Sequence, residues 1–319
     1  GIMKKGFRII KFKKDKPIFQ LKDISKSFDG RPILKKISME MYPGEIVGLL
    51  GANGSGKSTL YSTIIGEHSA DTGKILINNV DISEKPIHER SLAGIGYLSQ
   101  QRSVFGMSVY DNLLGICQLS IKESKKQIDM VEKLLDEFNL QHLRELHSNV
   151  LSGGEVRRLM MARILINKPS VIFLDEPTSG LDPEIRNSIW KLIKTIKNKG
   201  TTIVLTTHYM EEAELLCDRV AFLNKGQIVA LDTPKALIKS LNSPYSVEIS
   251  ISTEWNKNWL DGLDGIIDLH ILGNHDGYVI QFKANDIFAI IQKIAAITKL
   301  NDLELSHISI KSGTLNDVF

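Results

Sequence analysis

The chain has 319 residues, of which 42% are apolar and 24% are charged, with a formal net charge of +3. This composition is typical of an ordinary globular protein, and the length is sufficient for two domains. No apolar stretch approaches the roughly 18 residues of a membrane-spanning helix, and no secretory leader is recognisable. We therefore expect a protein that, if it works at a membrane, does so from the aqueous side.

Basic residues are concentrated at the N-terminus. Residues 1–16 carry seven lysines and arginines against one acid, whereas the remainder holds 33 basic and 36 acidic residues, a net charge of −3. A mildly acidic body lacks the basic surface that nucleic acids require, and we expect no nucleic-acid partner. Residues 1–17 form a basic tail that is either a solvated terminus or a contact for anionic lipid or an acidic partner.

The cysteines indicate a reducing compartment. Cys117 and Cys217 both lie in apolar, helix-like surroundings and lack metal-ligand spacing. Buried free thiols in a cytoplasmic protein fit this pattern better than a disulfide does.

Two strand-like segments, 18–21 and 33–41, flank the dipeptide Asp29-Gly30, which favours a tight hairpin turn. Phe28 directly precedes this turn, 29 residues before Lys57. Its ring could stack on an adenine base or could be a core residue at the end of a strand. The residues alone leave both readings open.

A glycine-rich segment follows an apolar strand at 45–50 and precedes a helical segment at 59–65. Such a turn presents successive backbone N–H groups, and the positive end of the helix dipole, to an anion. Lys57 is expected to reach the β- and γ-phosphates of a nucleoside triphosphate, and the Ser58 hydroxyl to bind Mg²⁺. The chain is therefore predicted to bind a nucleoside triphosphate through Gly51, Asn53, Gly54, Ser55, Gly56, Lys57, Ser58 and Thr59.

The next segments predict two short strands and two helices. Residues 73–78 and 94–100 are expected to be strands, and the apolar spacing of 121–146 predicts a helical stretch. Ser152 is a good N-cap for a helix that continues over 156–167. Because Gly153 and Gly154 expose backbone donors at the start of this helix, it is a second potential phosphate site.

An apolar segment at 170–176 predicts a buried strand that ends in two carboxylates. Asp175 suits a magnesium site, and Glu176 suits a general base for an attacking water. A turn at 179–183 and a helix at 184–199 follow, and His208 comes at the end of a further strand at 201–207. The alternation of strands and helices predicts an α/β domain with a largely parallel sheet and a ligand at the carboxyl ends of its strands.

The pattern changes near residues 242–244, where we place a domain boundary. Beyond it, strands are expected at 245–251, 266–272, 278–283 and 303–310, and an amphipathic helix at 286–298. They predict a small α+β accessory domain without a catalytic constellation.

Four motifs in this order, Gly51–Ser58, Leu151–Glu155, Val171–Glu176 and His208, resemble the ATP-binding subunit of an ABC transporter. The resemblance covers roughly residues 18–236. It implies a mainly parallel sheet with an antiparallel β subdomain and a helical subdomain at about 101–167. The expected organisation is a tail at 1–17, an ABC-type ATPase domain at 18–242 and an accessory domain at 243–319.

The resemblance assigns a role to each matching residue. Phe28 corresponds to an adenine-stacking ring, Asp182 to an aspartate at the subunit interface, and Ser152, Gly153 and Gly154 to a cap that completes the ATP site of a facing copy. The remaining roles concern hydrolysis: Gln100 contacts Mg²⁺ and the attacking water, Asp175 binds the metal, Glu176 is the base, His208 contacts the γ-phosphate and Lys57 holds the phosphates. Two ATP molecules are thereby held in a head-to-tail dimer.

Two further runs, 208–214 and 313–319, resemble the ATPase subunits of ABC-2-type exporters of drugs and polysaccharides. This likeness implies a separate transmembrane permease and a place on the cytoplasmic face of the membrane. It also implies that the segment 104–110 forms a groove for a helix of the permease. The apolar residues of this segment could equally be ordinary core. The alternatives are a soluble ABC-type ATPase acting on nucleic acid or ribosomes, and an importer ATPase. Only 118 positions separate Lys57 from Asp175, which leaves no room for the long coiled coil of chromosome and repair ATPases.

Overall fold

A computed structural model describes residues 16–240, 245–252, 265–274, 277–300 and 305–318. The chain divides into two compact units, residues 1–233 and 234–319. Most of the expected basic tail and the expected boundary at 242–244 lie outside the described residues.

The central sheet of the first unit consists of β3 (Ile46–Leu50), β6 (Ile95–Leu98), β7 (Val171–Asp175), β8 (Thr202–Thr206), β9 (Arg219–Asn224) and β10 (Gln227–Asp232). The strand order is β10-β9-β3-β8-β7-β6. All neighbours pair in parallel except β10, which pairs antiparallel with β9 at one edge. The largely parallel α/β sheet expected from the sequence is therefore confirmed.

A second, antiparallel sheet consists of β1 (Phe19–Phe28), β2 (Arg31–Met41), β4 (Thr72–Ile77) and β5 (Val80–Asp81), in the order β2-β1-β4-β5. The expected turn at Asp29-Gly30 is present, and a second two-residue turn at Asn78-Asn79 joins β4 to β5. Asp29 and Gly30 have φ angles of 48° and 74°, and Asn78 and Asn79 have φ angles of 49° and 64°. Paired positive φ angles let a two-residue turn match the twist of the flanking strands, which explains the use of these dipeptides.

The helices of the first unit are α1 (Lys57–Ile65), α2 (Ile87–Leu92), α3 (Val109–Ser120), α4 (Ser124–Glu137), α5 (Gly153–Leu165), α6 (Pro183–Asn198) and α7 (Met210–Leu216). The helical stretch expected at 121–146 is shorter in the structure. It ends at Glu137 because Asn139 adopts a left-handed φ of 51°, and only the short 3-10 turns η1 (Gln141–Leu143) and η2 (Ser148–Val150) follow. Helix α3 was not predicted; Ser108 caps it by accepting a hydrogen bond from the Asp111 N–H at 3.0 Å.

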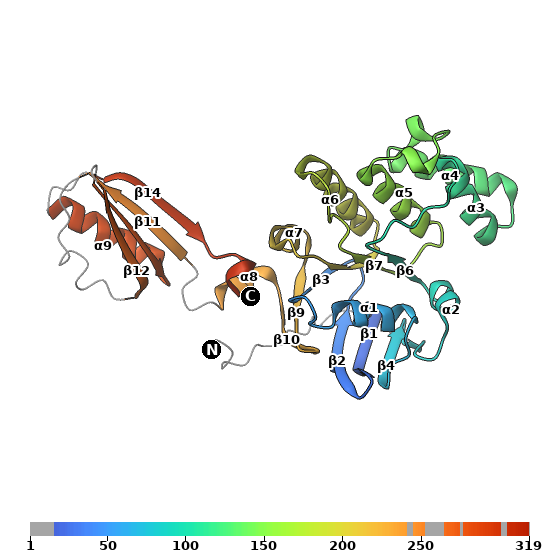
Figure 1. The fold of residues 1–319 in the computed structure, drawn as a ribbon, viewed down its shortest axis with the longest axis horizontal. Helices are drawn as coiled ribbons and strands as arrows, with labels where there is room; N and C mark the ends of the chain where they lie inside the picture. The colour runs from blue at the N-terminus through green and yellow to red at the C-terminus, as the bar shows by residue number, and fades with distance from the viewer. Residues whose placement is uncertain (1–15, 241–244, 253–264, 275–276, 301–304, 319) are drawn as a thin grey trace. The chain divides into compact units, whose positions relative to one another are not determined.

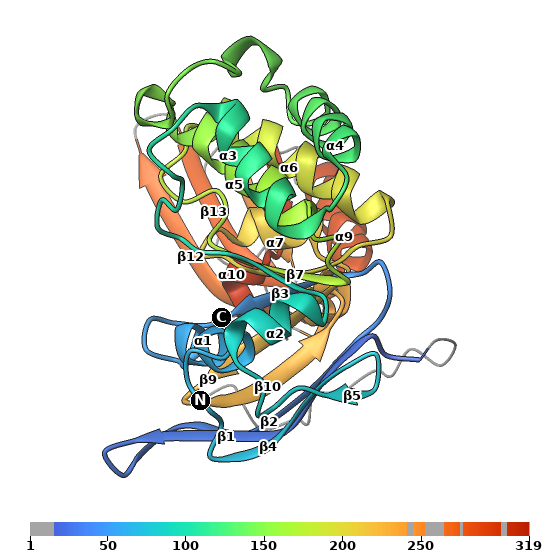
Figure 2. The same cartoon turned by 90° about the vertical axis from the view of Figure 1, so that its right-hand side faces the viewer.

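Helix α1 shares one apolar core with both sheets. Figures 1 and 2 show it between β3 and the antiparallel sheet. Its Leu60, Tyr61 and Ile64 are buried in the same cluster as Phe19 of β1 and Phe173 of β7. Because α1 begins at Lys57, this packing fixes the phosphate loop against the ends of the parallel strands.

The second unit contains β11 (Tyr245–Ile251), β12 (Ile266–Asn274), β13 (Gly277–Ala284), β14 (Leu305–Ser312), α8 (Pro234–Lys239), α9 (Ile287–Leu300) and α10 (Leu315–Val318). Its strands form an antiparallel sheet in the order β12-β13-β11-β14. Ile287, Ile290 and Ile294 of α9 pack on the apolar side chains of β11 and β13. Nowhere in the described part of either unit is a helix both long and apolar enough to cross a bilayer.

Candidate active site

The carboxyl ends of the parallel strands surround a cavity of about 720 Å³. The phosphate loop follows β3, Gln100 follows β6, Asp175 ends β7 with Glu176 directly after it, and His208 follows β8. Parallel strands bring these segments to one edge of the sheet although they are far apart in the sequence. The cavity is lined by Ile33, Asn53, Gly54, Gly56, Lys57, Ser58, Thr59, Gln100, Asp175, Glu176 and His208.

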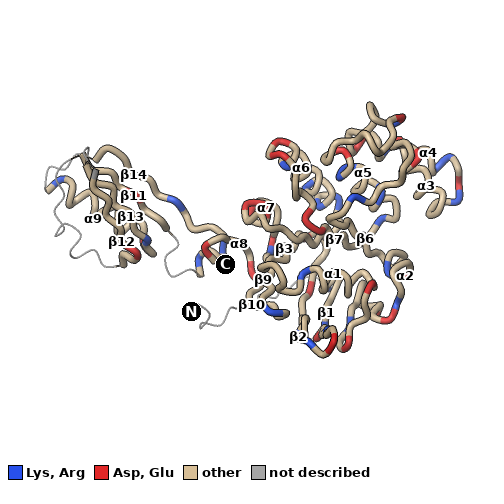
Figure 3. Tube along the Cα trace, in the orientation of Figure 1, with Lys and Arg blue, Asp and Glu red and all other residues tan. Residues whose placement is uncertain are grey.

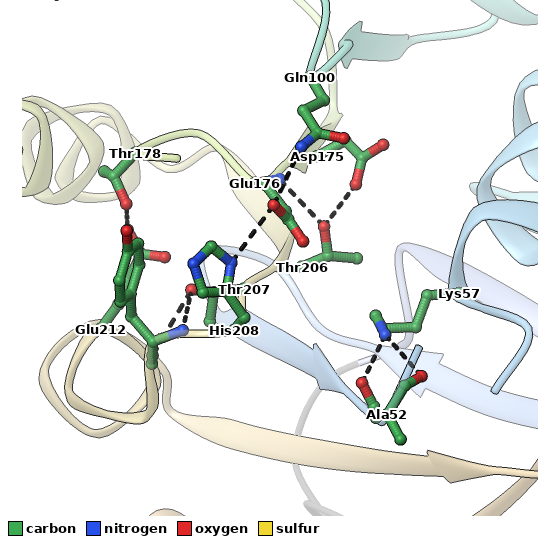
Figure 4. Close-up of polar contacts among 12 residues, drawn as sticks. Ala52, Lys57, Gln100, Asp175, Glu176, Thr178, Thr206, Thr207, His208 and Glu212 are labelled. Atoms are coloured by element: carbon green, nitrogen blue, oxygen red, sulfur yellow. Dashed lines mark hydrogen bonds and ion pairs between the residues drawn. The ribbon is translucent and has the colours of Figure 1, made fainter. Parts of the chain in front are cut away.

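The phosphate loop has the backbone conformation that its glycines permit. Gly54 and Gly56 have φ angles of 78° and 110°, in the region that side chains disfavour. The Lys57 ammonium donates to the carbonyl oxygens of Gly51 and of Ala52, the latter at 3.1 Å (Figure 4). Burial lowers the pKa of Lys57, and the negative charges of Glu176 and Asp175 oppose that shift. The cation is thus held at the loop, facing the two acids.

Gly51 and Ser55 form the inner wall of the loop, outside the cavity lining. A Cβ atom at Gly51 would lie 2.4 Å from the Leu223 carbonyl oxygen and 2.5 Å from Ser55 Oγ. Only glycine fits this close approach between the loop and β9. Gly51 therefore shapes the loop rather than lining the cavity.

Thr206 of β8 holds both acids of β7. Its hydroxyl donates to Asp175 Oδ1 at 2.6 Å and accepts from the Glu176 N–H at 3.0 Å (Figure 4). Glu176 has a φ of 44°, a left-handed conformation that non-glycine residues rarely adopt. Such conformations are retained at functional sites, and here the turn redirects the chain directly after Asp175.

Three expected site residues from three elements meet at one oxygen atom. Glu176 Oε2 accepts a hydrogen bond from Gln100 Nε2 at 3.2 Å and lies 3.3 Å from His208 Nδ1 (Figure 4). This atom faces the cavity opposite Lys57, where a γ-phosphate and an attacking water would lie.

The residues facing Lys57 also suit a magnesium ion. The Ser58 hydroxyl, the Asp175 carboxylate and the Gln100 amide line the same cavity, and oxygen donors of these types are the ligands that Mg²⁺ prefers. Beside them, burial and the charge of Asp175 raise the pKa of Tyr97 to about 12, so that its phenol stays neutral near the carboxylate.

Arg157 of α5 is a residue that the sequence analysis missed. It is 8% exposed, and its guanidinium donates to the carbonyl oxygens of Ser99 at 2.8 Å and Gln100 at 2.7 Å. Figure 3 shows basic residues of α5 near the acidic end of β7. Arg157 thereby fixes the Gln100 loop from the helix that Ser152 caps.

The remaining expected residues lie outside this cavity. Ser152 and Glu155 form a reciprocal capping box at the start of α5, and a Cβ on Gly153 would lie 3.2 Å from a methyl group of Leu181. The cap thus adjoins the loop that carries Asp182, the N-cap of α6. Ser152, Gly153, Gly154 and Asp182 therefore form a second cluster, separate from the Lys57 cavity.

Phe28 is 39% exposed at the end of β1, just before the β1–β2 turn. Its ring centroid lies 5.1 Å from that of His68, and the Lys26 ammonium lies 5.3 Å from it. An aromatic ring with this exposure has a surface available for stacking.

A phosphate loop that faces two acids at the ends of parallel strands defines a P-loop nucleoside triphosphatase. The family model for ABC transporters matches residues 34–179. The lipopolysaccharide export system ATP-binding protein LptB of Escherichia coli K12 is 38% identical over 220 residues, which cover 68% of this chain and 91% of the relative. The chain belongs to the ABC transporter family of ATP-binding proteins, which are ATPases, as the sequence predicts.

Further relatives agree with this assignment. The Nod factor export ATP-binding protein I of Rhizobium etli is 38% identical over 228 residues, covering 71% of this chain and 72% of the relative. The solved structure of cbiO1 from Clostridium perfringens has a TM-score of 0.66 and 31% identity, covering 71% of this chain and 92% of the other. The ADP conformation of the ATP-binding cassette MJ1267 has a TM-score of 0.62 and 28% identity over 69% and 92% of the two chains.

Proposed function

We propose that this chain is the ATP-hydrolysing subunit of an exporter and that it drives a separate membrane-spanning permease from the cytoplasmic face of the membrane. The observation that carries export is the 38% identity to ATP-binding proteins of two export systems, for lipopolysaccharide and for Nod factor. The resemblance of residues 208–214 and 313–319 to ABC-2-type exporters points in the same direction.

The hydrolytic step uses the residues of the cavity. Lys57 and the N–H groups of the phosphate loop bind the β- and γ-phosphates, and Ser58, Gln100 and Asp175 would hold a Mg²⁺ ion. When bound, the ion neutralises charge on the phosphate oxygens.

Glu176 Oε2 accepts a proton from a water whose oxygen attacks the γ-phosphorus, while the bond from that phosphorus to the β–γ bridging oxygen breaks and ADP leaves. Gln100 and His208 already contact Glu176 Oε2, and they orient the water and the γ-phosphate.

A head-to-tail dimer accounts for the second cluster. Ser152, Gly153 and Gly154 present a helix N-terminus, a favourable place for a phosphate, yet they do not line the cavity of their own chain. If the cap of one copy faces the cavity of the other, each ATP is held between two chains, with Phe28 on its adenine and Asp182 at the contact. Hydrolysis then removes the γ-phosphate that joins the copies.

The permease is proposed to dock beside the Gln100 loop. A cavity of about 590 Å³ lies there between β6 and α5, lined among others by Arg102, Met160 and Arg163. In the adjoining apolar segment, Phe105 and Met107 are 46% and 38% exposed, whereas Val109 is fully buried. The exposed side chains and the cavity suit a helix of the membrane subunit, and Val109 belongs to the core.

The test is Glu176→Gln, with ATPase activity, nucleotide binding and size-exclusion chromatography as readouts. We expect ATP binding to persist, turnover to fall more than about hundredfold, and a dimer to accumulate with ATP and Mg²⁺. The matched control is the double variant that carries both Glu176→Gln and Ser152→Arg. It should keep ATP binding but no longer form the dimer. Normal hydrolysis by Glu176→Gln would contradict the assignment of Glu176 as the base. A Glu176→Gln chain that stays monomeric with ATP and Mg²⁺ would contradict the shared site. Recovery of the native chain from membranes without a polytopic subunit would contradict the exporter role.

A further inference from the structure

Glu212 of α7 is a fully buried acid that the hydrolytic mechanism does not use. Its Oε1 accepts hydrogen bonds from the Thr178 hydroxyl at 2.6 Å (Figure 4) and from the Trp190 indole N–H at 2.7 Å. Its Oε2 is buried and finds no hydrogen-bond partner among the described residues. A half-satisfied buried carboxylate costs stability, so packing alone does not explain an acid at this position.

The Thr178 contact joins two segments that carry active-site residues. Thr178 is fully buried and follows Glu176 by two residues, in the loop that leads to Asp182. Glu212 follows His208 by four residues, at the start of α7. The hydrogen bond therefore connects the loop that begins at Glu176 to residues 208–212, which form the His208 arm.

A second contact joins the His208 arm to the first turn of α6, which directly follows Asp182. The guanidinium carbon of Arg186, one turn into α6 after Asp182, lies 3.9 Å from the ring centroid of Tyr209. The Tyr209 ring in turn lies 4.0 Å from that of His208. Stacking of arginine on an aromatic ring is attractive and orients both groups. The His208 arm is therefore joined once to the loop 176–182 and once to the start of the helix that follows this loop.

We propose that Glu212 is a positioning residue of the ATPase site. By binding Thr178, it makes the loop 176–182 and the His208 arm move as one body. This inference rests on the proposed function, because in the head-to-tail dimer Asp182 contacts the facing copy. A shift of that loop when the copies meet is then transmitted to His208, so that each site becomes competent for hydrolysis when its partner is in place.

The test compares two variants that each remove one hydrogen bond to the same oxygen atom. Thr178→Val keeps the side-chain volume and removes the bond to the loop, whereas Trp190→Phe removes the bond to α6 and leaves the loop attached. Thr178→Ser retains the hydroxyl and is the conservative rescue. For each variant, kcat and KM for ATP hydrolysis are measured together with the urea midpoint of unfolding.

For Thr178→Val we expect kcat to fall about tenfold to hundredfold, because the base and His208 lose their fixed relative position. KM for ATP should change little, since Thr178 does not line the nucleotide cavity. Trp190→Phe, at a comparable urea midpoint, should keep kcat within about twofold, and Thr178→Ser should restore it. Tyr209→Leu is the second variant, at a partly exposed position, and should lower kcat in the same manner.

Equal kcat values for Thr178→Val and Trp190→Phe, or no recovery in Thr178→Ser, would overturn the assignment and leave Glu212 a structural residue. If Thr178→Val does not fold, an unchanged kcat in Tyr209→Leu would overturn the coupling of the two segments. Failure of the proposed function is recognised separately, because the unsubstituted chain would then show neither ATP hydrolysis nor an ATP-dependent dimer.

Discussion

Replacing Arg157 by methionine tests whether helix α5 controls the Gln100 loop. Methionine keeps most of the packing volume of the side chain and removes both hydrogen bonds to the carbonyl oxygens of Ser99 and Gln100. The loop would then lose its link to α5, and with it the geometry in which Gln100 Nε2 donates to Glu176. We expect both stability and turnover to decrease.

The magnitude follows from the contacts. Hydrogen bonds from a charged group contribute about 1.5–3 kcal/mol each, so two of them contribute roughly 3–6 kcal/mol. Burial lowers the pKa of Arg157, which reflects the cost of holding its charge at low exposure, and the apolar replacement recovers part of that cost. A net loss of about 3 kcal/mol remains, which corresponds to a decrease in Tm of about 6–12 °C for a unit of this size.

The matched control is Arg158→Met on the same helix. The Arg158 guanidinium donates to Ser188 Oγ of α6 at 3.0 Å and does not contact the Gln100 loop. Urea unfolding followed by tryptophan fluorescence, to which the buried Trp190 contributes, gives the stability, and steady-state ATP hydrolysis gives kcat. We expect Arg157→Met to lower kcat at least tenfold and Arg158→Met to leave it within about twofold. Equal kcat values in the two variants would refute the reasoning.

Two further substitutions test the proposed adenine contact of Phe28 and the ion pair at the amino end of the central sheet. Phe28→Ala should raise the Kd for ATP about tenfold to hundredfold, since stacking of a nucleobase on an aromatic ring contributes about 1–3 kcal/mol. Phe28→Trp should retain the affinity of the unsubstituted chain. Equal ATP affinities of Phe28→Ala and the unsubstituted chain would exclude stacking. Arg219→Met leaves Glu45 without the arginine that donates to it at 3.0 Å, and urea unfolding should show a loss of about 3–5 kcal/mol. The ATP affinity of Arg219→Met should not change, because the pair lies at the amino end of β3, away from the nucleotide cavity. A decrease in the free energy of unfolding below about 1 kcal/mol would contradict a stabilising role of the Arg219–Glu45 pair.

Local sequence signals were sufficient for much of the fold and for most of the cavity. The turns at Asp29-Gly30 and Asn78-Asn79 require positive φ angles that few residue types adopt, so the dipeptides predict the hairpins directly. The cavity residues each follow a strand, and parallel pairing brings the strand ends together without further information.

Contacts that depend on register or on tertiary packing could not be predicted. Thr206 binds Asp175 because β7 and β8 pair with these two residues opposite each other, and nothing within either strand states that register. Arg157 reads as one of several basic residues on a helix surface until the helix is packed against the Gln100 loop. Helix α3 was missed because its capping residue, Ser108, lies inside the apolar segment 104–110, where the sequence pattern does not mark the start of a helix.

The described part of the run at 313–319, up to Val318, has a structural reason for its sequence. Leu315 is fully buried, and α10 packs on α8, the helix that directly follows the ATPase unit. Asp317 accepts hydrogen bonds from the Thr314 N–H at 2.7 Å and from its hydroxyl at 3.0 Å, which caps the short helix. The chain thus returns, after the four-stranded sheet, to the point where the accessory unit begins. A short pattern of one apolar residue and one capping residue is therefore sufficient here. Together they hold α10 against α8, the first helix of the second unit.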